Sequence, residues 1–288
     1  QIVHGMVEYV ERYEPFACYL AERGYAVLGH DHLGHGKTAE TEAELGYFAK
    51  KDGDRHVIGD IYRLTCNGRE RWPGVPLFIM GHSMGSYFTR KYLTRYSRKV
   101  DGAIIMGTGS QPMAALRFGQ NLCRFMAKVK GWRYRWPFVD NMAFGGYNKH
   151  FRPARTTRDW LTKDERIVDA YLADERCTFL FTLNGYYNLF HSIEEASKPE
   201  NLQKMPKDLP VLFASGTEDP VGSFGKGVEQ VRKAFQAAGM EDVTWILYEN
   251  DRHEILNETD RATVYKDLYA WLYVRMSDPR RKTGGKRL

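Results

Sequence analysis

The chain has 288 residues, 43% of them hydrophobic and 14% aromatic, which is enough for one large α/β domain or two small ones with a sizeable core. Its net charge of +6 is only mildly basic, and the lack of any run of about 18 apolar residues excludes a membrane-spanning helix. The four cysteines stand far apart with no CxxC pair, which argues against a disulfide framework or structural zinc and favours a cytoplasmic protein with reduced thiols: Cys18, Cys66, Cys123 and Cys177.

Short apolar runs alternate with amphipathic segments along most of the chain. Strands are predicted at residues 2–5, 25–31, 75–83, 101–109, 209–217 and 243–249. Helices are predicted at residues 12–24, 84–97, 224–238 and 255–275. This alternation predicts an α/β fold with a mostly parallel sheet covered by helices on both faces. The opening QIVHG resembles the inside of a buried strand, so we expect that N-terminal strands are missing upstream.

The alternation breaks between residues 110 and 206, where the pattern is helical. Amphipathic helices are predicted at 114–129, 162–175 and 179–196. A helical insertion between two strands predicts a cap (lid) over the sheet. The predicted division is therefore 1–109 and 207–276 for the α/β core, 110–206 for the cap, and 277–288 for a basic, frayed tail.

A serine bracketed by two glycines marks the junction between a predicted strand and a predicted helix. Gly81-His82-Ser83-Met84-Gly85 matches G-x-S-x-G, in which a sharp turn lifts the serine hydroxyl above the sheet edge. Neighbouring backbone comes too close for side chains at the flanks, and the N-terminus of the following helix favours developing negative charge. Ser83 is therefore the candidate nucleophile.

A serine hydroxyl needs a base and an acid that orients the base, and this elbow requires the chain order Ser, Asp or Glu, His. Asp219 follows one predicted strand and His253 follows the next. Asp219 is preferred over the adjacent Glu218 because it precedes Pro220 in a turn that fixes it. The candidate triad is Ser83, Asp219 and His253. The backbone N–H groups of Met84 and of Met6, which follows His4-Gly5, are the candidate oxyanion hole.

Two other motifs do not support a phosphate or metal site. GHGKT at 34–38 lacks the first glycine of a phosphate-binding loop, since Asp31 occupies that position. His30, His32 and His35 lie close in sequence but lack a further ligand at suitable spacing for zinc. We therefore expect no metal and no cofactor.

These motifs together resemble the α/β-hydrolase superfamily. More narrowly, the chain resembles the monoacylglycerol lipase and lysophospholipase branch, which shares a domain type with S33 serine aminopeptidases. The resemblance covers nearly the whole sheet domain and is carried by VHGMVEYVERYEPFACYLAERGYAVLGHDHLGHGKT, GHSMGS, SGTEDPVG and HEILNE. It implies the same triad and oxyanion hole, and a cap that lines an acyl-chain pocket.

The resemblance also raises an expectation about association. Members of the family carry two further strands before the one at residues 2–5, and without them the strand at 25–31 would be an open edge. Such an edge can pair with a second copy, so a homodimer is a hypothesis.

The predicted cap is rich in basic and aromatic residues. This composition fits docking on an anionic lipid surface, and equally a solvated cationic face over an aromatic core. No nucleic-acid partner is expected, because the triad would then have no purpose. The substrate-binding residues cannot be assigned from sequence, and the aromatic candidates are Phe118, Phe125, Trp132, Trp136 and Tyr186.

The function expected from sequence is hydrolysis of a carboxylic ester, such as a monoacylglycerol or a lysophospholipid, through an acyl-enzyme on Ser83. An aminopeptidase or amidase with the same triad is the first alternative, with Glu194 and Glu195 available for a substrate amine. A non-catalytic binding protein of the same fold is the second. The expected location is the cytoplasm, with peripheral membrane contact through the cap.

Overall fold

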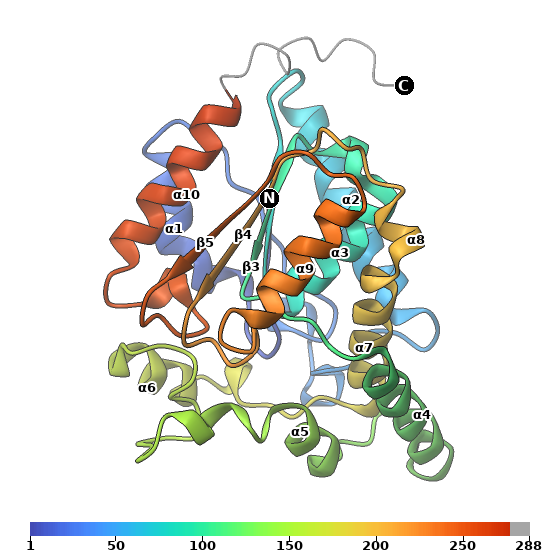
Figure 1. Ribbon diagram of the computed structural model, residues 1–288. Coiled ribbons are helices and arrows are strands. Elements are labelled where there is room, and N and C mark those ends of the chain that lie inside the picture. Colours follow the sequence, from blue (N-terminus) through green and yellow to red (C-terminus); the bar gives the residue numbers. More distant parts are fainter. Residues whose placement is uncertain (277–288) are drawn as a thin grey trace.

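The computed structural model describes residues 1–276, and a parallel five-stranded sheet forms its centre (Figure 1). The predicted tail at 277–288 lies outside the described residues. The strands follow one another across the sheet in chain order, and every neighbouring pair is parallel. They are β1 (Ile2–Val3), β2 (Phe78–His82), β3 (Gly102–Met106), β4 (Val211–Gly216) and β5 (Val243–Tyr248). The predicted α/β-hydrolase fold with a mostly parallel sheet is confirmed.

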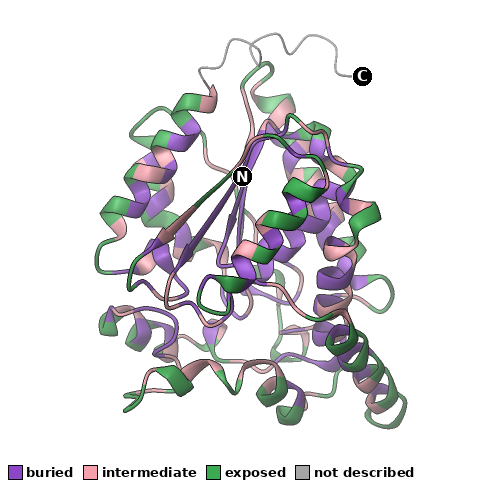
Figure 2. Ribbon diagram, viewed as in Figure 1, coloured by how far each residue is buried: buried purple, intermediate pink, exposed green. Residues whose placement is uncertain are grey.

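Alternate residues of the central strands enter two separate cores, one on each face of the sheet. In β3, Ala103 and Ile105 belong to one buried cluster, whereas Ile104 and Met106 belong to the other. This division follows from the period of two in a strand, where successive side chains point to opposite faces. Both faces are apolar because helices cover both, as the buried strands in Figure 2 show.

Five helices provide that cover. On one face lie α1 (Glu14–Ala21) and α10 (Arg261–Met276), and on the other lie α2 (Gly53–Arg71), α3 (Met84–Tyr96) and α9 (Lys226–Ala237) (Figure 1). The helix α2 is absent from the helices predicted from sequence. Three glycines, at 53, 59 and 68, lower its intrinsic helix propensity, and packing of Val57, Ile58 and Ile61 into the core stabilises it instead.

The strand predicted at 25–31 is wrong. This segment makes a single parallel bridge, between Ile2 and Gly29, and the Ile2 N–H donates to the Leu28 carbonyl at 2.7 Å. The partner strand β1 has only two residues, so no longer ladder can form. The homodimer hypothesis assumed a regular open strand here, and it stays a prediction.

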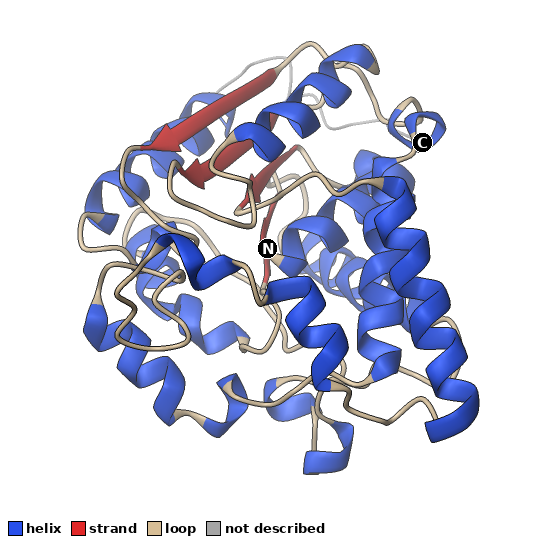
Figure 3. Cartoon of the chain, turned by 60° about the horizontal axis from the view of Figure 1, so that its bottom comes forward, coloured by secondary structure: helices blue, strands red, loops and turns tan. Residues whose placement is uncertain are grey.

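The helical segment between β3 and β4 contains α4 (Met113–Lys130), α5 (Pro137–Phe144), α6 (Glu165–Ala173), α7 (Leu183–Ser197) and the short α8 (Pro199–Leu202). Most of it lies beyond the ends of the strands (Figures 1 and 3). However, α7 packs against α2 and α3, and Tyr186, Leu189 and Ile193 share a core cluster with them. The boundaries predicted for a cap at 110–206 therefore remain a prediction, since α7 is part of the packing of the sheet domain.

Candidate active site

Ser83 occupies a strained turn between β2 and α3. Its backbone has φ 54° and ψ −120°, a combination that non-glycine residues rarely adopt. The Ser83 N–H donates to the Met106 carbonyl of the neighbouring strand at 3.0 Å, which fixes the turn to the end of β3. Strain held in place by surrounding structure is typical of functional positions. The elbow predicted from G-x-S-x-G is therefore present in the structure.

The glycines around Ser83 are required by close backbone contacts. A Cβ on Gly85 would lie 2.1 Å from the Val3 carbonyl oxygen, and one on Gly81 would lie 2.3 Å from the Gly85 carbonyl oxygen. Real Cβ atoms do not approach backbone oxygens this closely. The structure thus confirms the steric reason that the sequence suggested for the two flanking glycines.

The predicted acid and base form a buried pair. His253 Nδ1 lies 3.0 Å from Asp219 Oδ1, and the two side chains are 2% and 0% exposed. Asp219 also accepts hydrogen bonds from the Val221 N–H at 2.9 Å and the Ser215 hydroxyl at 3.1 Å. Burial alone would raise the pKa of Asp219, but the charge and hydrogen bond of His253 outweigh it and lower the pKa. The carboxylate is thus held ionised and aimed at His253 Nδ1.

The loop after β1 lies beside the serine. A Cβ on Gly5 would stand 3.2 Å from Ser83 Cβ, so this loop passes directly over the elbow. Val7 has φ 55°, which is strained for a β-branched residue, and its carbonyl accepts a hydrogen bond from the Tyr171 hydroxyl at 2.9 Å. Met6, between Gly5 and Val7, lines the same cavity as Ser83. Met84 is the first residue of α3, so its N–H has no acceptor within the helix.

A network of buried charged groups beneath the triad was not predicted. Arg12 pairs with Glu8 and with Glu254, each at 2.7 Å. The Tyr13 hydroxyl donates to Glu8 at 2.7 Å and lies 2.9 Å from His82 Nδ1. Sequence offered only a weak signal for it, namely Glu8 three residues after Gly5 and Glu254 directly after His253.

His82 connects this network to His253, the predicted base. Its Nε2 lies 3.2 Å from the His253 carbonyl oxygen. Burial would lower the pKa of His82, but the hydrogen bond and charge of Glu8 outweigh burial, so the pKa is raised. His82, the residue before Ser83, therefore helps to hold the backbone of His253 in place.

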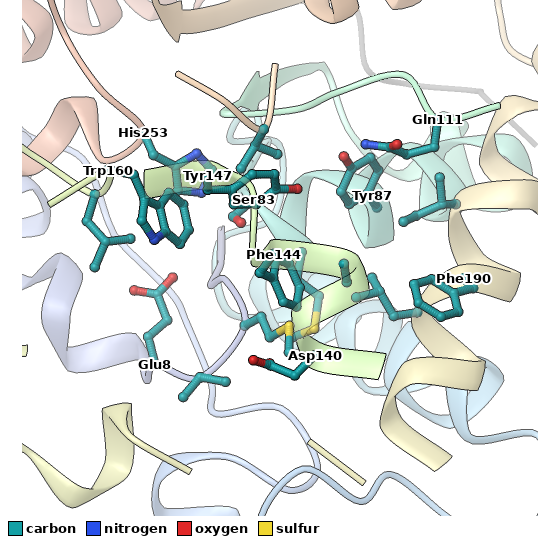
Figure 4. A pocket seen from close by; sticks show the side chains of 18 of the residues that line it. Glu8, Ser83, Tyr87, Gln111, Asp140, Phe144, Tyr147, Trp160, Phe190 and His253 are labelled. Atoms are coloured by element: carbon teal, nitrogen blue, oxygen red, sulfur yellow. The ribbon is translucent and has the colours of Figure 1, made fainter. Parts of the chain in front are cut away.

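A largely apolar cavity of about 300 Å³ opens at Ser83 and His253 (Figure 4). Tyr147 and Trp160 flank the triad, and the Trp160 ring packs on the His253 ring with centroids 5.1 Å apart. In Figure 4, Phe190 lies on the side of Ser83 opposite Trp160. Such a cavity suits an apolar chain placed next to a reacting ester.

Of the five aromatic candidates for substrate binding, Phe118 lines this cavity and the other four do not. Phe125 is 65% exposed on the outer side of α4, and Tyr186 is fully buried, with its hydroxyl donating to Asp140 at 2.5 Å. Trp132 packs on Tyr187, and Trp136 packs on Phe138. Helical periodicity places these residues on a helix but not on the cavity side, because the direction of each helix depends on tertiary packing.

The histidines considered as metal ligands are packed near the loop after β1. His32 is buried, with its N–H donating to His4 Nε2 at 2.9 Å and its ring 5.3 Å from that of His30. Among the described residues, one acidic group has its oxygens close enough for a metal ion: Asp251, Glu258 and Asp260. The ammonium of Lys163 lies 2.7 Å from Asp251 and already supplies a cation there.

A second buried cation lies behind the cavity, on α3. Arg90 is 2% exposed and donates to the Gly109 carbonyl at 3.0 Å, to Thr108 Oγ1 at 3.2 Å and to Ser197 Oγ at 3.1 Å. These partners stand at the start and near the end of the inserted helical segment. Burial lowers the pKa of Arg90 to about 10, so its charge persists at neutral pH.

The profile of the serine aminopeptidase S33 family matches residues 1–260, which is most of the chain. The chain belongs to this family. Monoglyceride lipase from Mus musculus is 30% identical to the S33 chain over 280 residues, covering 96% of the chain and 82% of that enzyme. A monoglyceride lipase homolog of Monkeypox virus is 33% identical over a shorter stretch of 85 residues, which is 30% of the chain and 29% of that protein.

A solved structure agrees with these relatives. A thermostable carboxyl esterase from Bacillus coagulans, crystallised with glycerol, superposes with a TM-score of 0.89 at 26% identity, covering 96% of the S33 chain and 89% of the esterase. The chain is therefore a monoglyceride-lipase-like α/β hydrolase. None of its helices within residues 1–276 is both long and apolar enough to cross a bilayer.

Proposed function

We propose that the chain is a serine carboxylic-ester hydrolase that cleaves monoacyl lipids or similar acyl esters. The observation that carries this proposal is the buried His253–Asp219 pair at 3.0 Å beside the strained Ser83, on the wall of an apolar cavity. The names of the relatives support it, because they describe lipases and an esterase. The free thiols of all four cysteines fit the cytoplasm as the proposed location.

The proposed reaction forms and breaks an acyl-enzyme. His253 Nε2 takes the proton of the Ser83 hydroxyl as its oxygen attacks the ester carbonyl, while Asp219 holds the Nδ1–H and stabilises the imidazolium. The N–H groups of Met6 and Met84 donate to the oxyanion. His253 then protonates the departing alcohol, and it activates a water that releases the fatty acid from Ser83. No step needs a cofactor.

The aminopeptidase alternative is not favoured by the cavity. An amine-binding site would need a free carboxylate near Ser83, and Glu194 and Glu195 do not line the cavity. Glu194 accepts hydrogen bonds from Arg117 at 3.0 Å and Gln120 at 2.6 Å. Ester hydrolysis does not require a carboxylate that binds a substrate amine.

Labelling and turnover of soluble esters test this proposal. A fluorophosphonate is expected to label Ser83, and p-nitrophenyl esters of increasing chain length are expected to be cleaved with an optimum at a medium or long acyl chain. Ser83→Ala should abolish labelling and lower kcat by about 10⁶-fold. Ser192→Ala is the matched control, since Ser192 lies on α7 and its buried hydroxyl has no hydrogen-bond partner among residues 1–276. Labelling that persists in Ser83→Ala would contradict the assignment of the nucleophile.

We also propose that the outer face of α4 and α5 contacts a lipid surface. Large apolar side chains on it are exposed, among them Phe125 at 65%, Val129 at 65% and Phe138 at 54%. Lys128 and Lys130, near the end of α4, are exposed beside them. Apolar side chains bordered by lysines are typical of helices that bind anionic lipid. Arg135 is excluded as a lipid contact, because it donates to the carbonyls of Leu180, Glu42 and Leu45.

Charge reversal at the two lysines tests this contact. Lys128→Glu with Lys130→Glu should weaken sedimentation with vesicles of phosphatidylglycerol and phosphatidylcholine. Lys266→Glu, on the exposed side of α10, should leave vesicle binding almost unchanged. Equal binding by both variants would refute the lipid contact but leave ester hydrolysis untouched.

A further inference from the structure

The cavity contains one cation that the proposed reaction does not use. Arg158 lies between α5 and α6 and is half-buried. Of the described residues that line the cavity, it is the only lysine or arginine. Its side chain therefore contributes the one permanent positive charge of the lining.

The guanidinium of Arg158 has no protein partner within residues 1–276. Its backbone N–H donates to Thr156 Oγ1 at 3.0 Å, but its side chain takes part in no hydrogen bond and no ion pair there. The three carboxylates that line the cavity are already engaged. Arg12 holds Glu8 and Glu254, and the Tyr186 hydroxyl donates to Asp140 at 2.5 Å.

Two buried tyrosines lie within electrostatic reach of Arg158. Burial raises the pKa of both Tyr171 and Tyr186, and the positive charge of Arg158 acts on both in the opposite direction. Both tyrosines are buried, and the Tyr171 hydroxyl reaches the Val7 carbonyl at 2.9 Å. Arg158 and Tyr171 both line the cavity, so the positive charge of Arg158 is available to a bound substrate.

Two sides of the cavity differ in chemistry. On the side of Phe190 the lining is apolar, with Leu116, Leu189 and Ile193. Trp160 lies on the opposite side (Figure 4), and Arg158, two residues before it in the chain, also lines the cavity. An acyl chain is best accommodated on the first side, so the alcohol part of the ester faces the second.

We propose that Arg158 binds an anionic oxygen group, a phosphate or a carboxylate, on the alcohol part of the ester substrate. This inference rests on the proposed ester hydrolysis. A guanidinium matches both groups in geometry, because its planar fork can donate two parallel hydrogen bonds. Asp140 is the opposing charge in the cavity, and its engagement by Tyr186 reduces its competition for Arg158. The substrate class is thus a monoacyl ester with a negatively charged head group.

Short-chain esters below their micelle concentration test the proposal without any lipid surface. The substrates are 1-octanoylglycerol, 1-octanoylglycerol 3-phosphate and the octanoyl ester of lactate, which are neutral, phosphate-bearing and carboxylate-bearing. The wild type is compared with Arg158→Gln, Arg158→Lys and the control Arg152→Gln. Arg152→Gln removes one positive charge, as Arg158→Gln does. However, Arg152 is exposed and lies outside the cavity lining.

We expect Arg158→Gln to lower kcat/KM for the preferred anionic ester by about tenfold to hundredfold, mainly through KM. Turnover of 1-octanoylglycerol should stay unchanged in Arg152→Gln and should fall much less than turnover of the anionic ester in Arg158→Gln, and Arg158→Lys should recover part of the loss. The anionic ester that loses more activity in Arg158→Gln shows whether Arg158 binds a phosphate or a carboxylate. An unchanged ratio of anionic to neutral turnover in Arg158→Gln would overturn the role of Arg158. Failure of the wild type to cleave any ester, with no fluorophosphonate labelling, would instead overturn the proposed function.

Discussion

Replacing Gly85 by alanine should damage the active site without touching a catalytic side chain. The added Cβ would lie 2.1 Å from the Val3 carbonyl oxygen and 2.4 Å from that of His4. Ordinary carbon–oxygen contacts are about 3.3 Å or longer, so α3 and the loop after β1 must separate by roughly 1 Å. That separation would pull Ser83 and Met84 away from Met6. A misplacement of about 1 Å can lower the rate by about 10²-fold, and the overpacking should cost about 1–3 kcal/mol of stability.

The assay compares Gly85→Ala with Gly59→Ala. Gly59 lies inside α2, and nothing stands within 4 Å of the position of its Cβ, so alanine there should stabilise the helix by about 0.5–1 kcal/mol. Turnover of p-nitrophenyl octanoate, the rate of fluorophosphonate labelling and the thermal midpoint are measured for both. Turnover, the labelling rate and the thermal midpoint should all be lower in Gly85→Ala than in the wild type, whereas Gly59→Ala should keep full turnover. Turnover of Gly85→Ala within about twofold of wild type would refute the steric account of the elbow.

Three further predictions concern ionisable groups. Asp219→Asn should lower kcat by about 10⁴-fold without loss of the fold, whereas turnover that survives it would make another acid the partner of His253. Arg12→Met should cost about 3–5 kcal/mol in urea unfolding, because it leaves Glu8 and Glu254 buried without their cation, and a smaller loss would show that water reaches them. Burial raises the pKa of Asp251 from 3.8 to about 6, so its contribution to stability is complete below about pH 4 and is lost as the pH rises through 6. Asp251→Asn should therefore show a smaller fall in Tm between pH 4 and pH 7 than the wild type, and an equal fall would contradict this pKa.

The parts of the molecule that sequence predicts well are those fixed by local chemistry. Ser83 was found because the sharp turn leaves room only for glycine at 81 and 85. Asp219 and His253 were found because each follows an apolar strand, and parallel strands end at the same edge of a sheet. The structure brings these two together in one hydrogen bond.

The parts that sequence missed depend on contacts between distant segments. The strand predicted at 25–31 does not form because its partner β1 has only two residues. The helix α2 was not predicted because its glycines interrupt the apolar pattern of the sequence. The Arg12–Glu254 pair joins residues 242 positions apart, and no local pattern announces it. The aromatic candidates were chosen by composition, and only packing decides that Phe118 lines the cavity whereas Phe125 faces outward.

Arg90 has a consequence for how an ester gains entry. The Arg90 guanidinium, on α3, donates hydrogen bonds to Gly109 at the start of the inserted segment and to Ser197 near its end. We therefore expect a movement that widens the mouth of the cavity to arise in the middle of the segment, around α5 and α6, rather than near its two ends. Ser83, at the start of α3, should keep its position during such a movement.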